Sequence, residues 1–159
     1  MIDKTEIEQK AKLFEILPAH VERDYVFGWL IYGIFTKSNL KDDIFLKGGN
    51  ALRKGYFENT RYSNDLDFGI PHDISQDTLL EEVNLVCKEI QTESGIEFNI
   101  SRNKVEEKFP PGSNKPIPNL QVYEVDVYFK DFSGIQKNSL LKSQWTLLAT
   151  TKQFMNQCP

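Results

Sequence analysis

Cysteine and histidine are scarce in this chain, with two of each among 159 residues. Two cysteines cannot build a disulfide scaffold, and Cys87 lies in an apolar helical pattern typical of a small core residue. No Cys/His spacing suited to zinc occurs, and neither a G-x-S-x-G elbow nor a P-loop motif is present. The sequence therefore gives no support for a zinc-stabilised protein, a serine hydrolase or a P-loop enzyme.

Long apolar runs and a signal peptide are also lacking. The most apolar segment, residues 25–35, has about half the length that a membrane span needs. It predicts a buried helix in which Gly28 and Gly33 let another element pack closely. The first residues carry neither the basic nor the apolar region of a secretory signal, so we expect a cytoplasmic protein with no membrane contact.

The chain also has no excess of basic residues. The net charge of −4 argues against a strongly basic nucleic-acid-binding module. Apolar residues make up 40% of the chain and charged residues 26%, which is ordinary for one globular domain. A local basic cluster is nevertheless present around one motif, and it consists of Lys47, Arg53, Lys54 and Arg61.

Hydrophobic periodicity predicts alternating helices and strands. The predicted helices span residues 3–17, 19–37, 50–57 and 75–94, and the predicted strands span residues 44–47, 65–70, 96–102 and 120–129. Asp3 and Ser75 suit helix N-caps, Gly95 suits a C-cap, and Pro18 would end the first helix. Residues 103–119 are rich in Pro, Lys and Glu and predict a loop.

The chemistry is concentrated in two motifs, F-L-K-G-G-N-A-L at residues 45–52 and R-Y-S-N-D-L-D-F at residues 61–68. In the first, a short strand ends at two glycines and a helix begins, so backbone N–H groups can approach a phosphate. In the second, Asp65 and Asp67 alternate with Leu66 and Phe68, so both carboxylates share one face of a strand. Two carboxylates at this spacing can hold Mg²⁺ or Mn²⁺.

Each motif also has a structural interpretation. A Gly-Gly pair is usually only a turn, and an Asp-x-Asp pair is often a solvated turn or a helix cap. Two carboxylates on one strand face repel each other, however, unless a cation or a basic side chain such as Lys47 or Arg61 offsets their charge. The combination of both motifs favours a nucleotide site over a structural role.

The same residues resemble the AbiEii/AbiGii nucleotidyltransferase toxin family of the DNA-polymerase-beta-like superfamily. The resemblance is continuous over about residues 20–70 and weaker as far as Gly134. Asn50 departs from it, because Thr or Ser is more usual after the glycines. The resemblance implies an α+β fold close to α/β, in which a mixed β-sheet is flanked by helices, with further helices at the N-terminus.

The resemblance also implies a function. The chain would be the toxin half of a type IV toxin–antitoxin or phage-defence pair, with a cognate antitoxin and an RNA acceptor such as tRNA. The aspartates Asp65 and Asp67 would bind Mg²⁺ or Mn²⁺ and act in catalysis. The residues expected to hold the nucleoside triphosphate are Gly48, Gly49, Asn50, Arg53, Arg61 and Ser63.

The resemblance also implies a third carboxylate on a later strand. Asp126, between Val125 and Val127, has the right local pattern, but the C-terminal sequence favours the alternative that it lies with Glu124 on the solvent face of an ordinary amphipathic strand. Asp126 is therefore a candidate catalytic residue with an open structural alternative.

The C-terminal residues bear on the same question. We expect residues 1–142 to form the nucleotidyltransferase-like domain and residues 143–159 to be an atypical tail, because the tail neither alternates cleanly nor resembles the family. One permitted set of codons for the tail reads S-V-D-V-T-R-Y-D-K-T-I-Y-E-P-M-S in another frame, which would supply the missing acid. Two hypotheses stay open: a metal-dependent nucleotidyltransferase, and a truncated or frameshifted remnant that binds nucleotide with little or no transfer.

Overall fold

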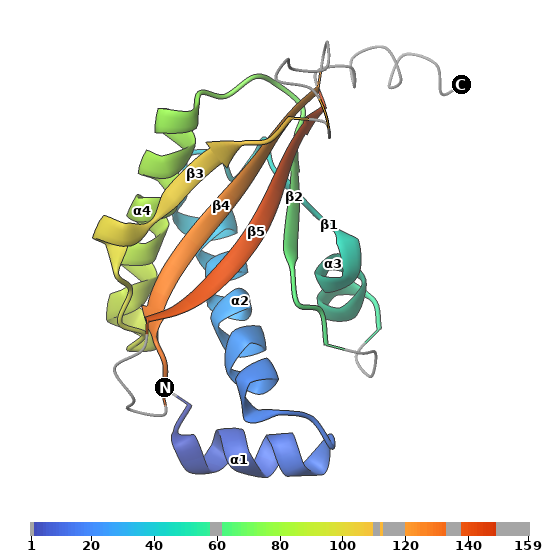
Figure 1. The fold of residues 1–159 in the computed structure, drawn as a ribbon, viewed down its shortest axis with the longest axis vertical. Helices are drawn as coiled ribbons and strands as arrows, with labels where there is room; N and C mark the ends of the chain where they lie inside the picture. The colour runs from blue at the N-terminus through green and yellow to red at the C-terminus, as the bar shows by residue number, and fades with distance from the viewer. Residues whose placement is uncertain (1, 58–61, 110–111, 113–119, 133–137, 149–159) are drawn as a thin grey trace.

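The chain opens with two helices, strands and helices alternate through its middle, and three strands close its described part (Figure 1). The computed structural model describes residues 2–57, 62–109, 112, 120–132 and 138–148. The helices are α1 (Lys4–Leu13), α2 (Pro18–Lys37), α3 (Gly48–Gly55) and α4 (Gln76–Ser94), with a short 3-10 helix η1 (Ile100–Arg102). The strands are β1 (Phe45–Lys47), β2 (Leu66–Ile70), β3 (Lys104–Glu107), β4 (Leu120–Lys130) and β5 (Asn138–Leu148).

The strands form one mixed sheet in the order β1-β2-β5-β4-β3. The β2–β5 pair is parallel, and the other neighbouring pairs are antiparallel. The predicted α+β fold with a mixed sheet and N-terminal helices is therefore confirmed. Because β5 lies between β2 and β4, the two long strands β4 and β5 form the centre of the sheet together with β2 (Figure 1).

The two faces of the sheet differ sharply in chemistry. On β4, Val125 and Val127 lie in the core, whereas Glu124 and Asp126 lie on the opposite face beside lysines of β3 and its C-terminal extension. Helices α2 and α4 cover the apolar face (Figure 1). The core between these layers includes Val26, Phe27, Leu30, Leu66, Phe68, Ile70, Leu79, Val83, Val86, Ile90, Val125 and Phe129.

The two glycines of α2 behave differently. A Cβ atom on Gly33 would lie 2.5 Å from Ile90 and 2.7 Å from Val86, so the predicted close packing is present there and the partner is α4. A Cβ on Gly28 would meet only the Lys54 ammonium, at 3.8 Å. Close packing within the described residues thus explains Gly33 but not Gly28.

Helix ends follow the predicted capping residues in most cases. The Asp3 side chain accepts a hydrogen bond from the Glu6 N–H, the Ser75 side chain accepts one from the Thr78 N–H, and Gly95 ends α4 with a φ of 72°. The prediction for the first helix was wrong at its end, because α1 stops at Leu13, well before residue 17. Pro18 instead opens α2, where the missing N–H of proline costs nothing.

The predictions for residues 96–119 were partly wrong. Residues 96–102 make only an isolated bridge, from Phe98 to Phe129, before η1 turns the chain. The Asn103 side chain accepts a hydrogen bond from the Tyr128 N–H, and strand β3 follows inside the predicted loop. Only Val105 of β3 is fully buried, so its four residues carry too weak an apolar signal to stand out.

Residues 143–148, assigned to an atypical tail, belong to β5. They pair with β2 from Leu66↔Ser143 to Ile70↔Leu147, and also with β4. The remaining tail residues, 149–159, lie outside the described residues.

Glu82 connects α4 to the turn that follows α2. Its carboxylate accepts hydrogen bonds from the Ser38 hydroxyl at 3.1 Å and from the Asn39 N–H and side-chain amide at 2.9 and 2.7 Å. Burial acts to raise the pKa of Glu82, but the hydrogen bonds from Asn39 and Ser38 outweigh it and leave the pKa lowered. The ionised form is therefore the one that the fold stabilises.

We expect Glu82→Gln to lose about 1–2 kcal/mol of unfolding free energy at pH 7. Because the folded pKa is depressed, this contribution is present above the unfolded pKa, near 4.5, and is lost as the pH falls through the folded pKa. Urea unfolding at pH 7 and pH 3 measures the difference, with the exposed neighbour Glu81→Gln as control. An equal loss at both pH values would contradict the role of the charge.

Candidate functional site

Gly48 and Gly49, the glycine turn, join β1 to α3 and pack against the second motif. Gly48 has a φ of 69°, and a Cβ there would lie 2.1 Å from the Asp67 carboxylate oxygen Oδ2. A Cβ on Gly49 would lie 2.9 Å from the Ser63 hydroxyl. Both glycines are exposed to solvent, so a ligand can reach the backbone at the N-terminus of α3.

Asp65 and Asp67, the aspartate pair, lie at the start of β2. Leu66 and Phe68 are 1% and 0% exposed, so the predicted alternation is present and anchors the strand in the core. Burial raises the pKa of Asp67, the Lys47 ammonium acts to lower it, and the negative charge of Asp65 raises it further. The pair thus holds two hard oxygen donors beside the glycine turn.

Asn50 lies beneath this site rather than on its surface. Its side chain is fully buried, and its amide Nδ2 donates to the Asp65 backbone carbonyl at 2.5 Å. The Ser63 hydroxyl donates to the same carbonyl at 3.3 Å. Asn50 Oδ1 is buried with no hydrogen-bond partner among the described residues. The Asn50 hydrogen bond therefore holds the loop that carries Asp65 against the first turn of α3, and the Ser63 hydrogen bond lies within that loop.

Arg53 is held by protein partners. Its guanidinium contacts the Asp24 carboxylate at 2.6 Å and stacks over the Tyr62 ring at 4.0 Å. Lys54 contacts the same carboxylate at 3.0 Å. Sequence reasoning missed Asp24, although an acid inside the strongly apolar second helix was an available signal. Arg61, the other predicted basic contact, lies outside the described residues.

Asp126 does not lie on the strand next to the aspartate pair. Strand β5 separates β2 from β4, and the residue paired with Asp67 on β5 is Gln144. In the next step across the sheet Gln144 pairs with Glu124, while Asp126 pairs with Lys142. The structure therefore brings the glycine turn, Asn50, Ser63 and the aspartate pair together, and it places Asp126 one strand further away.

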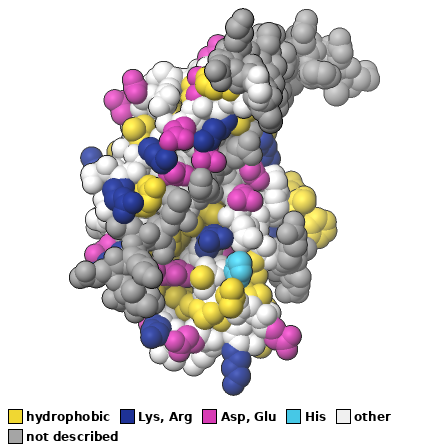
Figure 2. Space-filling view, in the orientation of Figure 1, with side chains coloured by type: hydrophobic (Ala, Val, Ile, Leu, Met, Phe, Trp, Pro, Cys, Tyr) yellow, Lys and Arg dark blue, Asp and Glu magenta, His cyan; other side chains and the backbone are white. Residues whose placement is uncertain are grey.

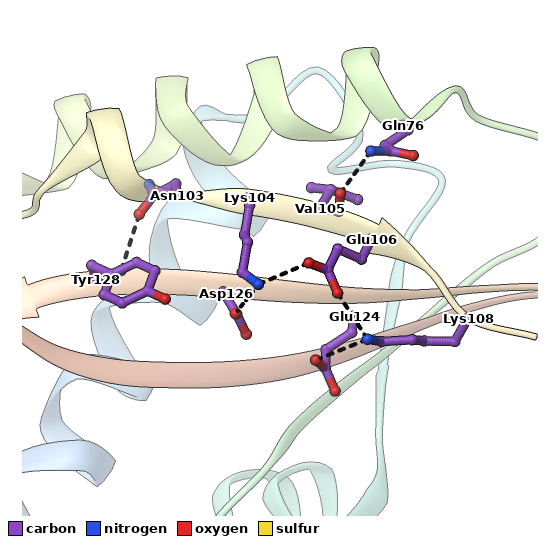
Figure 3. Close-up of polar contacts among 9 residues, drawn as sticks. All are labelled: Gln76, Asn103, Lys104, Val105, Glu106, Lys108, Glu124, Asp126 and Tyr128. Carbon is purple, nitrogen blue, oxygen red and sulfur yellow. Dashed lines mark hydrogen bonds and ion pairs between the residues drawn. The ribbon is translucent and has the colours of Figure 1, made fainter.

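Asp126 takes part in an ion-pair network on the polar face of the sheet (Figure 3). Lys104 lies 3.3 Å from Asp126 and 2.8 Å from Glu106, and Lys108 lies 2.9 Å from Glu106 and 3.3 Å from Glu124. These two lysines lower the pKa of Glu106 to about 2. Charged side chains of both signs gather on this face of the molecule (Figure 2).

Comparison with protein families decides the identity of the chain. The family model described as "Nucleotidyl transferase AbiEii toxin, Type IV TA system" matches residues 29–131, more than half of the sequence. The chain belongs to the AbiEii family. A search of curated proteins found no match. The matched region contains the glycine turn, the aspartate pair and Asp126, so the AbiEii assignment covers the site described above.

Two further findings concern this AbiEii chain as a whole. None of its described helices is both long and apolar enough to cross a membrane. Across the described ranges, no group of three or more His, Cys, Asp or Glu residues is arranged to hold a metal ion.

We expect Gly48→Ala to destabilise the protein by at least about 1–2 kcal/mol, because alanine is strained at this φ and its Cβ would collide with Asp67. The matched control is Gly55→Ala at the other end of α3, where a Cβ meets nothing within 4 Å. Urea unfolding compares the two, and equal stability of both variants would show that the contact with Asp67 does not constrain the turn.

Proposed function

We propose that this chain is a metal-dependent nucleotidyltransferase that moves a nucleotide from a nucleoside triphosphate to an RNA acceptor such as tRNA. The observation that carries the proposal is the contact between Gly48 and the Asp67 carboxylate. This contact brings the N-terminus of α3, which attracts anions, next to a pair of carboxylates, which attract a divalent cation.

The donor set of the aspartate pair suits Mg²⁺ or Mn²⁺. Two carboxylates on one strand face supply hard oxygen ligands, and the exposed glycine turn leaves room for phosphate oxygens beside them. Asp65 and Asp67 would hold the cation. When bound, it would neutralise charge on the triphosphate and polarise the phosphorus that is attacked.

The residues of the chain would contribute positioning. Backbone N–H groups at Gly48 and Gly49 would bind phosphate oxygens, and α3 would add its dipole. Asn50 and Ser63 would fix the Asp65 backbone through the hydrogen bonds described above. Buried Leu66 and Phe68 would keep the aspartate pair from moving away from the glycine turn. Such preorganisation is the main source of catalysis in phosphoryl-type transfer.

A second candidate function is nucleotide binding without turnover. The specific observation in its favour is the pairing of Gln144, rather than an acid, with Asp67 on the neighbouring strand. If the site is active, a third carboxylate must reach it from across β5, and Asp126 is the candidate despite its ion pair with Lys104.

Membership of the AbiEii family also indicates a biological role. Members are toxins of type IV toxin–antitoxin systems, which implies a cognate antitoxin and a nucleoside triphosphate substrate. We propose that this chain acts in the cytoplasm, where triphosphates and tRNA are available, and that the pair takes part in phage defence.

We expect Mg²⁺ or Mn²⁺ together with a nucleoside triphosphate to raise the melting temperature, because a ligand that binds only the folded state stabilises it. The double variant Asp65→Asn with Asp67→Asn should lose this shift and remain folded. The double variant Asp42→Asn with Asp43→Asn, at two exposed aspartates, is the charge-matched control. Retention of the full shift in the double variant would show that the metal–nucleotide site lies elsewhere.

Transfer itself is tested with labelled triphosphates and bulk tRNA. We expect the wild type to label RNA and Asp126→Asn to lower the rate about 10²–10⁴-fold, as for loss of a general base. The melting shift should survive in Asp126→Asn, because the aspartate pair is intact. A normal melting shift with no labelling by the wild type would favour the second candidate function.

A further inference from the structure

A groove lies on the outer side of α2, between α3 and α4, away from the aspartate pair. Its volume is about 600 Å³, which is within the usual range for ligand pockets. We call it the aromatic groove, and it is lined by Asp24, Tyr25, Gly28, Trp29, Tyr32, Lys54 and Glu93. Five of these residues come from α2, whose opposite side is buried against the sheet.

Three aromatic side chains follow one another along the groove. Tyr25, Trp29 and Tyr32 are spaced four and three residues apart, so they share one side of α2. Their rings pack edge to face, with centroids 6.4 and 5.6 Å apart and interplanar angles of 72° and 88°. Tyr32 is 41% exposed and the other two are half-buried. Lys37 lies over the Tyr32 ring, 5.9 Å from its centroid, and Phe132 packs edge to face with Tyr25, so Trp29 between them is the main ring for a further planar group.

Gly28 forms the floor of the groove between these rings. A glycine in a helix interior costs up to about 1 kcal/mol relative to alanine. At Gly33 the packing of α4 explains the glycine, but at Gly28 a Cβ would have open space apart from one ordinary contact with Lys54. A missing side chain at the floor of a groove lets a group from outside the chain approach the helix closely.

The charged residues of the groove indicate which kind of ligand it can bind. Asp24 contacts Arg53 at 2.6 Å and Lys54 at 3.0 Å, and Glu93 contacts Lys37 at 2.6 Å. Each lining carboxylate therefore already has a basic partner, and within the part of the chain that the structure describes the groove has no unpaired carboxylate to attract a cation. It offers aromatic faces together with hydrogen-bond donors and acceptors, which match a neutral planar ring with a polar edge.

We propose that the aromatic groove binds a nucleobase, at a site separate from the aspartate pair. A base would stack on the rings of Trp29 and its neighbours, as bases stack on aromatic side chains of single-strand-binding proteins. Its exocyclic amino groups and ring nitrogens would meet Asp24, Glu93 and Lys54 at the rim. The base can belong to a free nucleoside or to single-stranded RNA.

The test is a titration in EDTA with adenosine and with a single-stranded hexa-adenylate, followed by Trp fluorescence and calorimetry. We expect saturable quenching that is absent in Trp29→Phe, and about tenfold weaker binding in Trp29→Ala. Gly28→Ala should raise the melting temperature by about 2–4 °C yet weaken binding at least fivefold, because the methyl group occupies the floor. Gly55→Ala, the matched helix glycine outside the groove, should leave binding unchanged.

The double variant Asp65→Asn with Asp67→Asn separates this proposal from the proposed function. It should bind adenosine in EDTA as the wild type does. If this variant loses adenosine binding and Gly28→Ala does not change it, the base binds at the aspartate pair, and the proposal for the aromatic groove is wrong. Tighter binding of hexa-adenylate than of adenosine identifies RNA as the source of the base, and equal binding identifies free nucleosides. Displacement of bound adenosine by tetramethylammonium, or no saturable binding of either ligand, also overturns the proposal.

Discussion

The contact between the Gly48 backbone and the Asp67 carboxylate is the constraint on which the candidate site depends. It requires a positive φ and the absence of a Cβ at Gly48. It also requires β1 and β2 to be neighbours, which the Lys47↔Asp67 pairing provides. Because the β1–β2 pairing, the glycine turn and the start of α3 meet at this contact, a local change in any of them moves the carboxylate relative to the helix N-terminus.

The site is built on rigid supports rather than on the exposed groups themselves. Leu66 and Phe68 hold β2 in the core, and Asn50 connects the loop before β2 to α3 from below. The buried Asn50 amide makes one short hydrogen bond to the Asp65 carbonyl, so its role here is to support the loop. Asn50 therefore fixes the position of the Asp65 backbone, while the glycine turn stays exposed beside it.

Sequence reasoning found the parts of the structure that depend on local pattern. The β1–α3–β2 unit, the caps at Asp3 and Ser75 and the alternation around Asp65 and Asp67 follow from residues close together in the chain. The ion pair of Arg53 with Asp24, the place of β3 and the insertion of β5 between β2 and β4 depend on distant residues. Patterns of neighbouring residues do not specify such long-range pairings. Residues 104–107 are mostly polar, so the sequence did not reveal that they form a strand paired with β4.

The position of β5 has a consequence for how the protein assembles. It is the latest described strand in chain order, yet it occupies an interior place in the sheet and pairs Ser143 with Leu66. Because β5 lies between β2 and β4, the strands on its two sides have no direct pairing with each other until residues 138–148 are in place. Closing such a long loop is slow, and open strand edges invite pairing with other chains. Completion of the sheet, and with it the final surroundings of the strand that carries Asp67, therefore depends on a pairing between residues far apart in the chain.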